Sequence, residues 1–275
     1  MRDHNELTSV AANVRRNIIE MLHESGSGHP GGSLSAVEIV TALYFDEMNI
    51  DPENPNKENR DRFVLSKGHA APVIYSVLAE RKYFDKSELM KLRKTGAMLQ
   101  GHPDMKGTPG IEMSTGSLGQ GFSAACGMAM ASKLDGSPWR VYALLGDGEV
   151  QEGLVWEAAM SAAHYKLDNI VAFLDNNGLQ IDGKNEEVLG VDPLAEKFKA
   201  FGWNVFEIDG HDFDQIFTAL DAAKSAAGRP TMIVSKTVKG KGVSFMENQA
   251  GWHGKAPNAQ EREIALRDLG GRCDE

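Results

Sequence analysis

Apolar residues in the first half of the chain recur with the spacing of helices. Every fourth residue from Val10 to Leu22 is apolar, which places a continuous stripe on one helix face. Either Ser33 or Ser35 can cap a following helix. Helices are expected at residues 10–22, 36–45, 72–81, 85–94 and 118–133. Loops are expected at residues 25–32, 51–61 and 96–116, which are rich in glycine, proline and polar residues.

Short apolar runs alternate with helical segments in the second half of the chain. These runs are continuously apolar, and each is followed by glycine and polar residues. Such a pattern is typical of parallel strands buried between two layers of helices. Strands are expected at residues 62–66, 141–145, 170–174, 204–208 and 231–237. The intervening helices are expected at residues 154–165, 192–201 and 213–226.

The alternation predicts an α/β fold with a doubly wound, mainly parallel sheet flanked by helices. Residues 1–257 are expected to form one domain with an N-terminal helical part, because no linker divides them convincingly. Residues 258–275 are expected to form a C-terminal helix and tail. Asn258 and Glu261 have the spacing of a capping box, and Gly270 with Gly271 would end the helix.

Composition narrows the class of protein. The formal net charge is −10, which argues against nucleic-acid binding and against a polybasic membrane anchor. No apolar run approaches the roughly 20 residues that span a bilayer, and the first six residues are too polar for a signal peptide. Two cysteines, Cys126 and Cys273, make no disulfide framework. A cytoplasmic enzyme or binding protein fits this composition.

Two polar turns follow neighbouring apolar runs and carry the strongest chemical signal. Gly146-Asp147-Gly148 follows the run at 141–145, and Asp175-Asn176-Asn177-Gly178 follows the run at 170–174. If the two strands are neighbours, Asp147 and Asn177 project into one crevice, where their oxygens suit Mg²⁺ and leave room for phosphate. Each turn taken singly is better interpreted as an ordinary turn. Their joint position after buried strands favours a ligand site.

Residues 116–121, with the sequence GSLGQG, form a second glycine cluster. Its spacing differs from the dinucleotide-binding pattern, and the chain contains no nucleoside-triphosphate loop. A helix start with closely packed small residues is the alternative interpretation.

Several histidines and lysines lie in loops beside glycine. Histidine in such a loop can bind phosphate, contact a sugar hydroxyl or move a proton, although each one alone is as readily a surface residue. The candidates are His29, His69, His102 and His253. The remaining histidines are interpreted as structural: His4, His23, His164 and His211. A basic loop follows the last strand, and its lysines can attract an anion or simply face solvent: Lys236, Lys239 and Lys241.

Together these segments resemble the transketolase family. The stretch from Asp147 to Asn177 is similar to the thiamine-diphosphate motif, which begins with GDG and ends with NN. Residues 27–32, 65–70 and 116–121 resemble transketolase segments in the same order. The resemblance runs from about residue 7 to 257 and implies the diphosphate-binding domain of the thiamine-diphosphate-binding fold.

The resemblance also implies roles for individual residues. A divalent cation, Mg²⁺ or alternatively Ca²⁺ or Mn²⁺, would be held by Asp147, Asn177 and the backbone carbonyl of Leu179. The cofactor diphosphate and its surroundings would be contacted by Gly148, His69 and His253. The aminopyrimidine and thiazolium region would be approached by Gly116, Ser117 and Leu118. A channel for ketose cleavage would be lined by His29, His69, His102 and His253. Glu152 matches an acidic position that links the two active sites of the family's dimer.

The family's activating glutamate lies in a pyrimidine-binding domain to which no segment here corresponds. The resemblance therefore implies the N-terminal subunit of a two-chain transketolase, active with a C-terminal subunit in an α2β2 assembly. It would transfer a two-carbon ketol unit from a ketose, usually a sugar phosphate, to an aldose. The alternatives are the α subunit of a thiamine-diphosphate-dependent 2-oxo-acid dehydrogenase and a non-catalytic regulatory relative.

Overall fold

A five-stranded parallel sheet forms the centre of the molecule, whose computed structural model describes residues 2–270. The strand order is β1-β2-β3-β7-β6, and every neighbouring pair is parallel. The strands are β1 (Arg62–Leu65), β2 (Val141–Gly146), β3 (Ile170–Asn176), β6 (Asn204–Asp209) and β7 (Thr231–Lys236). This confirms the predicted parallel sheet.

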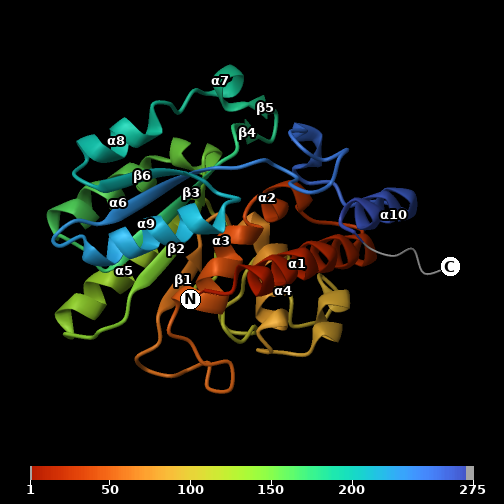
Figure 1. The fold of residues 1–275 in the computed structure, drawn as a ribbon, viewed down its shortest axis with the longest axis horizontal. Helices are drawn as coiled ribbons and strands as arrows, with labels where there is room; N and C mark the ends of the chain where they lie inside the picture. The colour runs from red at the N-terminus through yellow and green to blue at the C-terminus, as the bar shows by residue number, and fades with distance from the viewer. Residues whose placement is uncertain (1, 271–275) are drawn as a thin grey trace.

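Helices cover both faces of the sheet, because successive strand side chains point to opposite sides. On β2, Tyr142 and Leu144 join one buried cluster, whereas Val141 and Ala143 join the other. The first face packs against α1 (His4–Ser25), α3 (Val37–Ala42), α4 (Ala71–Glu80) and α9 (Phe213–Ser225). The second face packs against α5 (Gln120–Leu134), α6 (Gly153–His164) and α8 (Leu194–Ala200). The result is three layers, visible in Figure 1.

The first helix has clear start and stop signals. The Asp3 carboxylate accepts hydrogen bonds from the backbone N–H groups of Asn5 and Glu6, at 3.0 and 3.1 Å. Gly26 adopts a left-handed φ of 61° and ends the helix. The predicted apolar stripe is buried against α3 and α4.

The region after α1 differs from the sequence-based prediction. The glycine-rich segment expected to be a loop contains a short helix, α2 (Pro30–Leu34), which begins with proline because that residue needs no N–H partner. The capping prediction was wrong, since neither Ser33 nor Ser35 caps a helix. Beyond α3 the chain continues as a π-helical turn, η1 (Leu43–Glu47).

Several short elements were not foreseen. The predicted helix at 85–94 is a 3₁₀ segment, η3 (Lys86–Lys91). A small hairpin of β4 (Leu179–Gln180) and β5 (Gly183–Lys184) leads into α7 (Asn185–Val188). The other short turns are η2 (Gly68–Ala70), η4 (Gly148–Gln151) and η5 (Ala250–Trp252).

The C-terminal helix α10 (Ala259–Asp268) lies beside α1, as Figure 1 shows. The predicted capping box of Asn258 and Glu261 is present, with bonds of 2.9 and 2.8 Å. Arg262 pairs with both carboxylate oxygens of Glu20 on α1, each at 2.6 Å. The predicted helix stop at Gly271 and the second cysteine, Cys273, lie outside the described residues.

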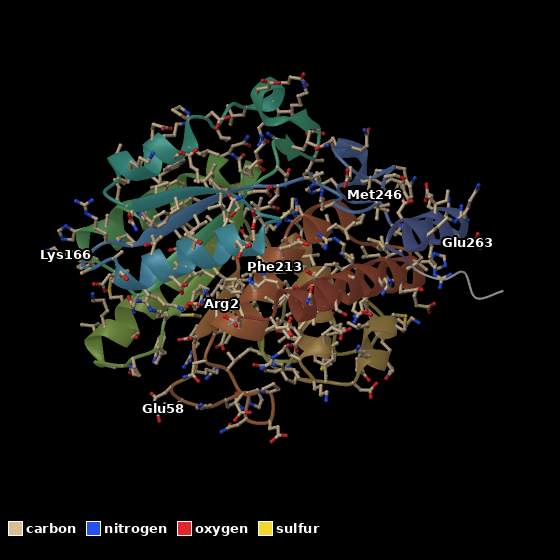
Figure 2. All side chains as sticks on the ribbon, viewed as in Figure 1. Arg2, Glu58, Lys166, Phe213, Met246 and Glu263 are labelled. Atoms are coloured by element: carbon tan, nitrogen blue, oxygen red, sulfur yellow. The ribbon has the colours of Figure 1, made fainter. Side chains whose placement is uncertain are left out.

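Most of the charged side chains lie on the outside of the molecule. Figure 2 shows Glu58, Lys166 and Glu263 projecting from the periphery, and all three are exposed. Within residues 2–270, none of the helices combines the length and the apolar character needed to cross a bilayer.

The three-layer arrangement predicts which substitutions destabilise the folded protein. Phe173, in the middle of β3, has 0% of its surface exposed, whereas Leu134 at the end of α5 has 80% exposed. We expect Phe173→Ala to lower the free energy of unfolding by about 3–5 kcal/mol, because it leaves a cavity between sheet and helices. The control Leu134→Ala should change it by less than about 0.5 kcal/mol. Urea unfolding curves measure both, and similar losses would contradict the burial assignment.

Candidate active site

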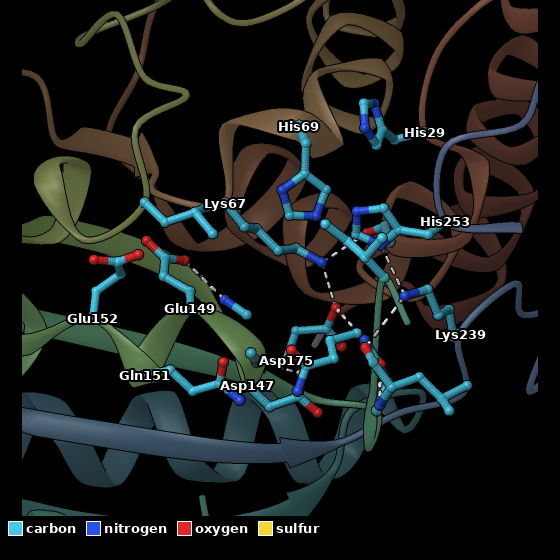
Figure 3. Close-up of a pocket in the computed structure, with 18 of the residues that line it drawn as sticks. His29, Lys67, His69, Asp147, Glu149, Gln151, Glu152, Asp175, Lys239 and His253 are labelled. Atoms are coloured by element: carbon cyan, nitrogen blue, oxygen red, sulfur yellow. Dashed lines mark hydrogen bonds and ion pairs between the residues drawn. The ribbon is translucent and has the colours of Figure 1, made fainter. Parts of the chain in front are cut away.

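The carboxyl ends of four neighbouring strands meet around one cavity of about 320 Å³. Residues that follow β1, β2, β3 and β7 form part of its wall, and three histidines form another part. Figure 3 shows the histidines gathered on one side and the acidic residues on the other. Open α/β sheets bind ligands beyond the carboxyl ends of their strands. This cavity is therefore the candidate active site.

A buried ion pair between Lys67 and Asp175 lies in the cavity wall. The Lys67 ammonium donates to Asp175 and to the carbonyl of Gly32, the latter at 2.7 Å. Asp175 also accepts from the hydroxyls of Ser35, at 2.6 Å, and Thr237. Burial opposes ionisation, but the Lys67 charge and these hydrogen bonds lower the pKa of Asp175 below its usual value. One ionised carboxylate thus joins four segments of the chain.

Asp147 is the first acidic group after β2 and has 2% of its surface exposed. Its carboxylate accepts hydrogen bonds from the backbone N–H groups of Gly178, at 2.5 Å, and Gly148, at 2.8 Å. Burial, and secondly the negative charge of Asp175, raise the pKa of Asp147 to about 6. A carboxylate that holds a proton this readily is also a good partner for a cation.

Asn177 brings a second side-chain oxygen to the same cavity as Asp147. Its amide nitrogen donates to Asp175 at 3.2 Å, which fixes the direction of the amide group. Its oxygen accepts the backbone N–H of Leu179 at 3.1 Å. The carbonyl of Leu179 in turn accepts from the Lys239 ammonium at 3.2 Å. The three oxygen groups proposed from the sequence therefore lie on one wall of one cavity.

Glu149 connects the two glycine-containing turns. It is 2% exposed and accepts from the Ser66 hydroxyl at 2.5 Å and from the backbone N–H groups of Gly119 and Gly146, at 2.9 and 3.0 Å. Burial raises the pKa of Glu149, although these three donors oppose the shift. Glu149 thereby holds the segment around residues 116–119 against the end of β2.

Lys239 extends into the cavity from the loop after β7. Its ammonium lies 3.0 Å from Nδ1 of His253, and burial lowers its pKa to about 8. The loop passes so close to α2 that a Cβ on Gly31 would lie 2.9 Å from the carbonyl oxygen of Trp252 and 3.0 Å from Lys239 Cγ. Glycine at position 31 is therefore required for this approach.

The four candidate histidines gather in space. The rings of His29, His69 and His253 have centroids 5.0–5.4 Å apart, and His102 lies 6.4 Å from His29. Burial is the main cause that lowers all four pKa values, to about 4 for His29 and about 3 for His253. Neighbouring cations lower them further, so the imidazoles are neutral at neutral pH.

Most of the residues singled out from the sequence line this cavity. They are His29, His69, Gly116, Leu118, Asp147, Gly148, Glu152, Asn177, Leu179 and His253. Two do not line it: Ser117 is exposed, and His102 is exposed beside His29 at the outer side of the cluster. His102 nevertheless lies beside Gly116, because a Cβ on Gly116, whose φ is 150°, would lie 3.1 Å from the His102 ring.

Sequence reasoning missed the buried charges that hold the site together. Lys67 and Glu149 stand inside or beside recognised motifs, but their main partners lie 108 and 83 positions away along the chain. Among the lysines after the last strand, Lys239 lines the cavity, whereas Lys236 is exposed. The available signal was a charged residue within four positions of the end of an apolar run.

Removing one member of the buried ion pair should lower the free energy of unfolding substantially. Lys67→Met leaves Asp175 as an uncompensated buried carboxylate, and we expect a loss of about 3–5 kcal/mol in the free energy of unfolding. The control Lys94→Met breaks an exposed pair with Glu24 and should cost less than about 1 kcal/mol. Chemical denaturation compares the two, and equal effects would contradict the central place of the Lys67 pair.

The histidine cluster predicts acid sensitivity. The folded-state pKa of His29 is about 4, below that of an unfolded histidine, so the folded protein binds fewer protons. Its contribution to stability is complete above about pH 6.5 and is lost as the pH falls toward about 4. We expect His29→Gln to lose less stability than the wild type between these values. A parallel pH dependence of the two unfolding free energies would rule out this contribution.

Comparison with known proteins shows which family and which proteins this chain resembles. A family described as "Transketolase, thiamine diphosphate binding domain" matches residues 7–274. The chain is 48% identical, over 93% of each chain, to a 6-deoxy-6-sulfo-D-fructose transketolase subunit from Clostridium sp. (strain MSTE9). It is 41% identical to one of the subunits of apulose-4-phosphate transketolase from Phocaeicola vulgatus, over 94% of this chain and 92% of that protein.

Longer transketolases match it over part of their length. Human transketolase is 44% identical over 96% of this chain and 42% of its own. The crystal structure of transketolase from Campylobacter jejuni superposes with a TM-score of 0.93 at 32% identity, covering 100% of this chain and 44% of that one. The agreement in sequence, in fold and over nearly the full length of the subunit relatives shows that this chain belongs to the transketolase family, as its thiamine diphosphate-binding part.

Proposed function

We propose that this chain is the thiamine diphosphate-binding subunit of a two-chain transketolase that transfers a two-carbon ketol unit from a ketose to an aldose. One observation carries the proposal: Asp147, Asn177 and a buried lysine face one cavity together with a cluster of neutral histidines. Oxygen ligands for a cation, a cation for a diphosphate and polar rings for a sugar are thereby combined.

The donor set fits a divalent metal such as Mg²⁺. Within residues 2–270, no group of three or more histidine, cysteine or acidic side chains is arranged so that it could hold a metal ion by itself. One carboxylate, one amide oxygen and one carbonyl match the preference of Mg²⁺, which usually takes one or two carboxylates and completes its shell with phosphate and water. We propose Asp147, Asn177 and the Leu179 carbonyl as these ligands, with Ca²⁺ or Mn²⁺ as alternative metals.

Lys239 supplies the positive charge for the diphosphate. Lys67 is paired with Asp175, whereas the contacts of Lys239 among the described residues are a carbonyl and the His253 ring. A buried ammonium without a carboxylate partner favours an anion, so we assign Lys239, with His253 and His69, to the diphosphate. Gly148 contributes space, because a Cβ there would lie 3.3 Å from Gln180.

The histidines supply polar contacts for a sugar. Bound thiamine diphosphate supplies the carbanion chemistry of ketol transfer. Because their pKa values are lowered, His29, His69, His102 and His253 offer neutral rings that accept or donate hydrogen bonds to hydroxyl groups and can take up a proton. Gly116, Ser117 and Leu118 lie at the remaining wall or its rim, and Glu152 lines the open side.

A second chain is proposed to complete the site. The relatives that match over 92–96% of their own length are named as transketolase subunits. We infer that the partner carries the pyrimidine-binding and C-terminal domains, and that two copies of each chain assemble. The names of these relatives support a sugar carrying a terminal phosphate or sulfonate as the substrate. Family membership argues against the alternative of a 2-oxo-acid dehydrogenase subunit.

The experiment reconstitutes the chain with the subunit that carries the pyrimidine-binding domain. With thiamine diphosphate and Mg²⁺, the complex should release a four-carbon aldose from D-fructose 6-phosphate or 6-deoxy-6-sulfo-D-fructose when an aldose acceptor is present. Asp147→Ala should reduce this rate by on the order of 100-fold, because a metal ligand is lost. The exposed control Glu58→Ala should retain wild-type activity.

Each outcome decides one part of the proposal. Full activity of the chain without its partner would refute the two-chain arrangement. An assembled complex that binds the cofactor but transfers no ketol unit from either donor would identify the non-catalytic relative instead.

A further inference from the structure

The loop at residues 237–242, here called the lysine loop, presents Lys239 to the cavity. This loop is held at several points. Gly240 donates its N–H to the carbonyl of Gly31 at 3.0 Å, and the Thr237 hydroxyl donates to Asp175. Two further contacts involve the residues on either side of Lys239 and Gly240, and they come from one buried polar network.

His211 makes the first of these contacts. The backbone N–H of Val238 donates to Nε2 of His211 at 2.9 Å. Since a backbone N–H can only donate, Nε2 is the unprotonated nitrogen and Nδ1 carries the hydrogen. Nδ1 lies 2.9 Å from Oε2 of Glu38 and donates to it. These two hydrogen bonds fix the tautomer and the orientation of the ring.

Arg15 makes the second contact and completes the network. Its guanidinium forms two bonds to Glu38, of 2.7 and 2.8 Å, while Nε donates to the Lys241 carbonyl at 3.1 Å. Arg15 and Glu38 are each 8% exposed. Although burial opposes it, His211 and Arg15 lower the pKa of Glu38 to about 2, so this carboxylate stays ionised.

The network thus reaches the lysine loop from outside the catalytic cavity. Arg15 lies on α1, Glu38 on α3 and His211 in the turn before α9. None of the three lines the cavity. Together they bind the loop at Val238 and at Lys241, one residue before and two residues after Lys239.

We propose that His211, oriented by Glu38, is a positioning residue that holds the Val238 N–H and thereby keeps Lys239 aimed at the cofactor diphosphate. A lysine side chain gains solvation by withdrawing its ammonium toward water. Lys239 is 2% exposed and close to a neutral histidine, so its buried position depends on a fixed backbone. The inference rests on the proposed role of Lys239 in cofactor binding.

Two substitutions separate the two hydrogen bonds of His211. Glutamine places its amide oxygen near the position of Nε2 and can accept the Val238 N–H, whereas asparagine reaches only the position of Nδ1 and keeps the bond to Glu38. In the reconstituted complex, His211→Asn should raise the dissociation constant of thiamine diphosphate on the order of tenfold, by analogy with other supporting residues. His211→Gln should restore affinity close to the wild-type value. Calorimetric titration in the presence of Mg²⁺ gives these constants.

A double-mutant cycle tests whether the effect passes through Lys239. In a Lys239→Ala background, His211→Asn should cause no further loss of affinity, because the residue that it positions is gone. Hydrogen exchange at residues 237–242 should be faster in His211→Asn than in His211→Gln, without any cofactor present. Glu20→Gln, which breaks the Arg262 pair at α10, is the control and should leave both readouts unchanged.

The outcomes distinguish this inference from the proposed function. If the wild-type complex binds no thiamine diphosphate, the proposed function itself is wrong. If it binds and both His211 variants lose affinity equally, in parallel with lost stability, His211 has a structural role alone and the inference is wrong. Additive effects of His211→Asn and Lys239→Ala would overturn it as well.

Discussion

The buried pair of Lys67 and Asp175 is the interaction on which this site depends. Neither side chain can lie so far from water without the other, because an isolated buried charge is far more costly than a paired one. Asp175 also accepts hydrogen bonds from hydroxyl groups in the loop after β7 and in the segment after α2. The ends of β1, β3 and β7 are consequently fixed against each other, and the cavity takes its shape from that junction.

Burial shifts the pKa values of the acidic and the basic groups of the cavity in opposite directions. It raises the pKa of Asp147 and lowers those of the histidines and Lys239, so each of these groups is displaced toward its neutral form. Hydrogen bonds and neighbouring charges then decide which groups remain ionised. A cation beside Asp147 and a diphosphate beside Lys239 would each relieve an unfavourable burial. The cavity is therefore suited to the proposed metal and the proposed anion together.

Support for the site extends into the layers of helices on the first face of the sheet. Glu38 and Arg15 belong to helices that also bury the apolar stripe of that layer, while His211 stands at the end of β6. The same packing that forms the hydrophobic core therefore sets the position of a polar network behind the cavity. On the opposite side, Glu149 performs a similar task for the glycine turn at residues 116–119. The ligand-facing residues are thus held by buried charges from both directions.

The sequence alone determined the fold class and most of the cavity wall. Continuously apolar runs followed by GDG and DNNG indicated parallel strands whose carboxyl ends meet. This rule brings Asp147 and Asn177 together once their strands are neighbours, as β2 and β3 are. The tertiary structure decided what local patterns do not contain: that Lys67 pairs with Asp175, that His211 faces Glu38, and that Ser117 and His102 stay outside the cavity wall. The partners of the buried charges come from segments distant along the chain, so their pairing is fixed only when the layers pack and water is excluded.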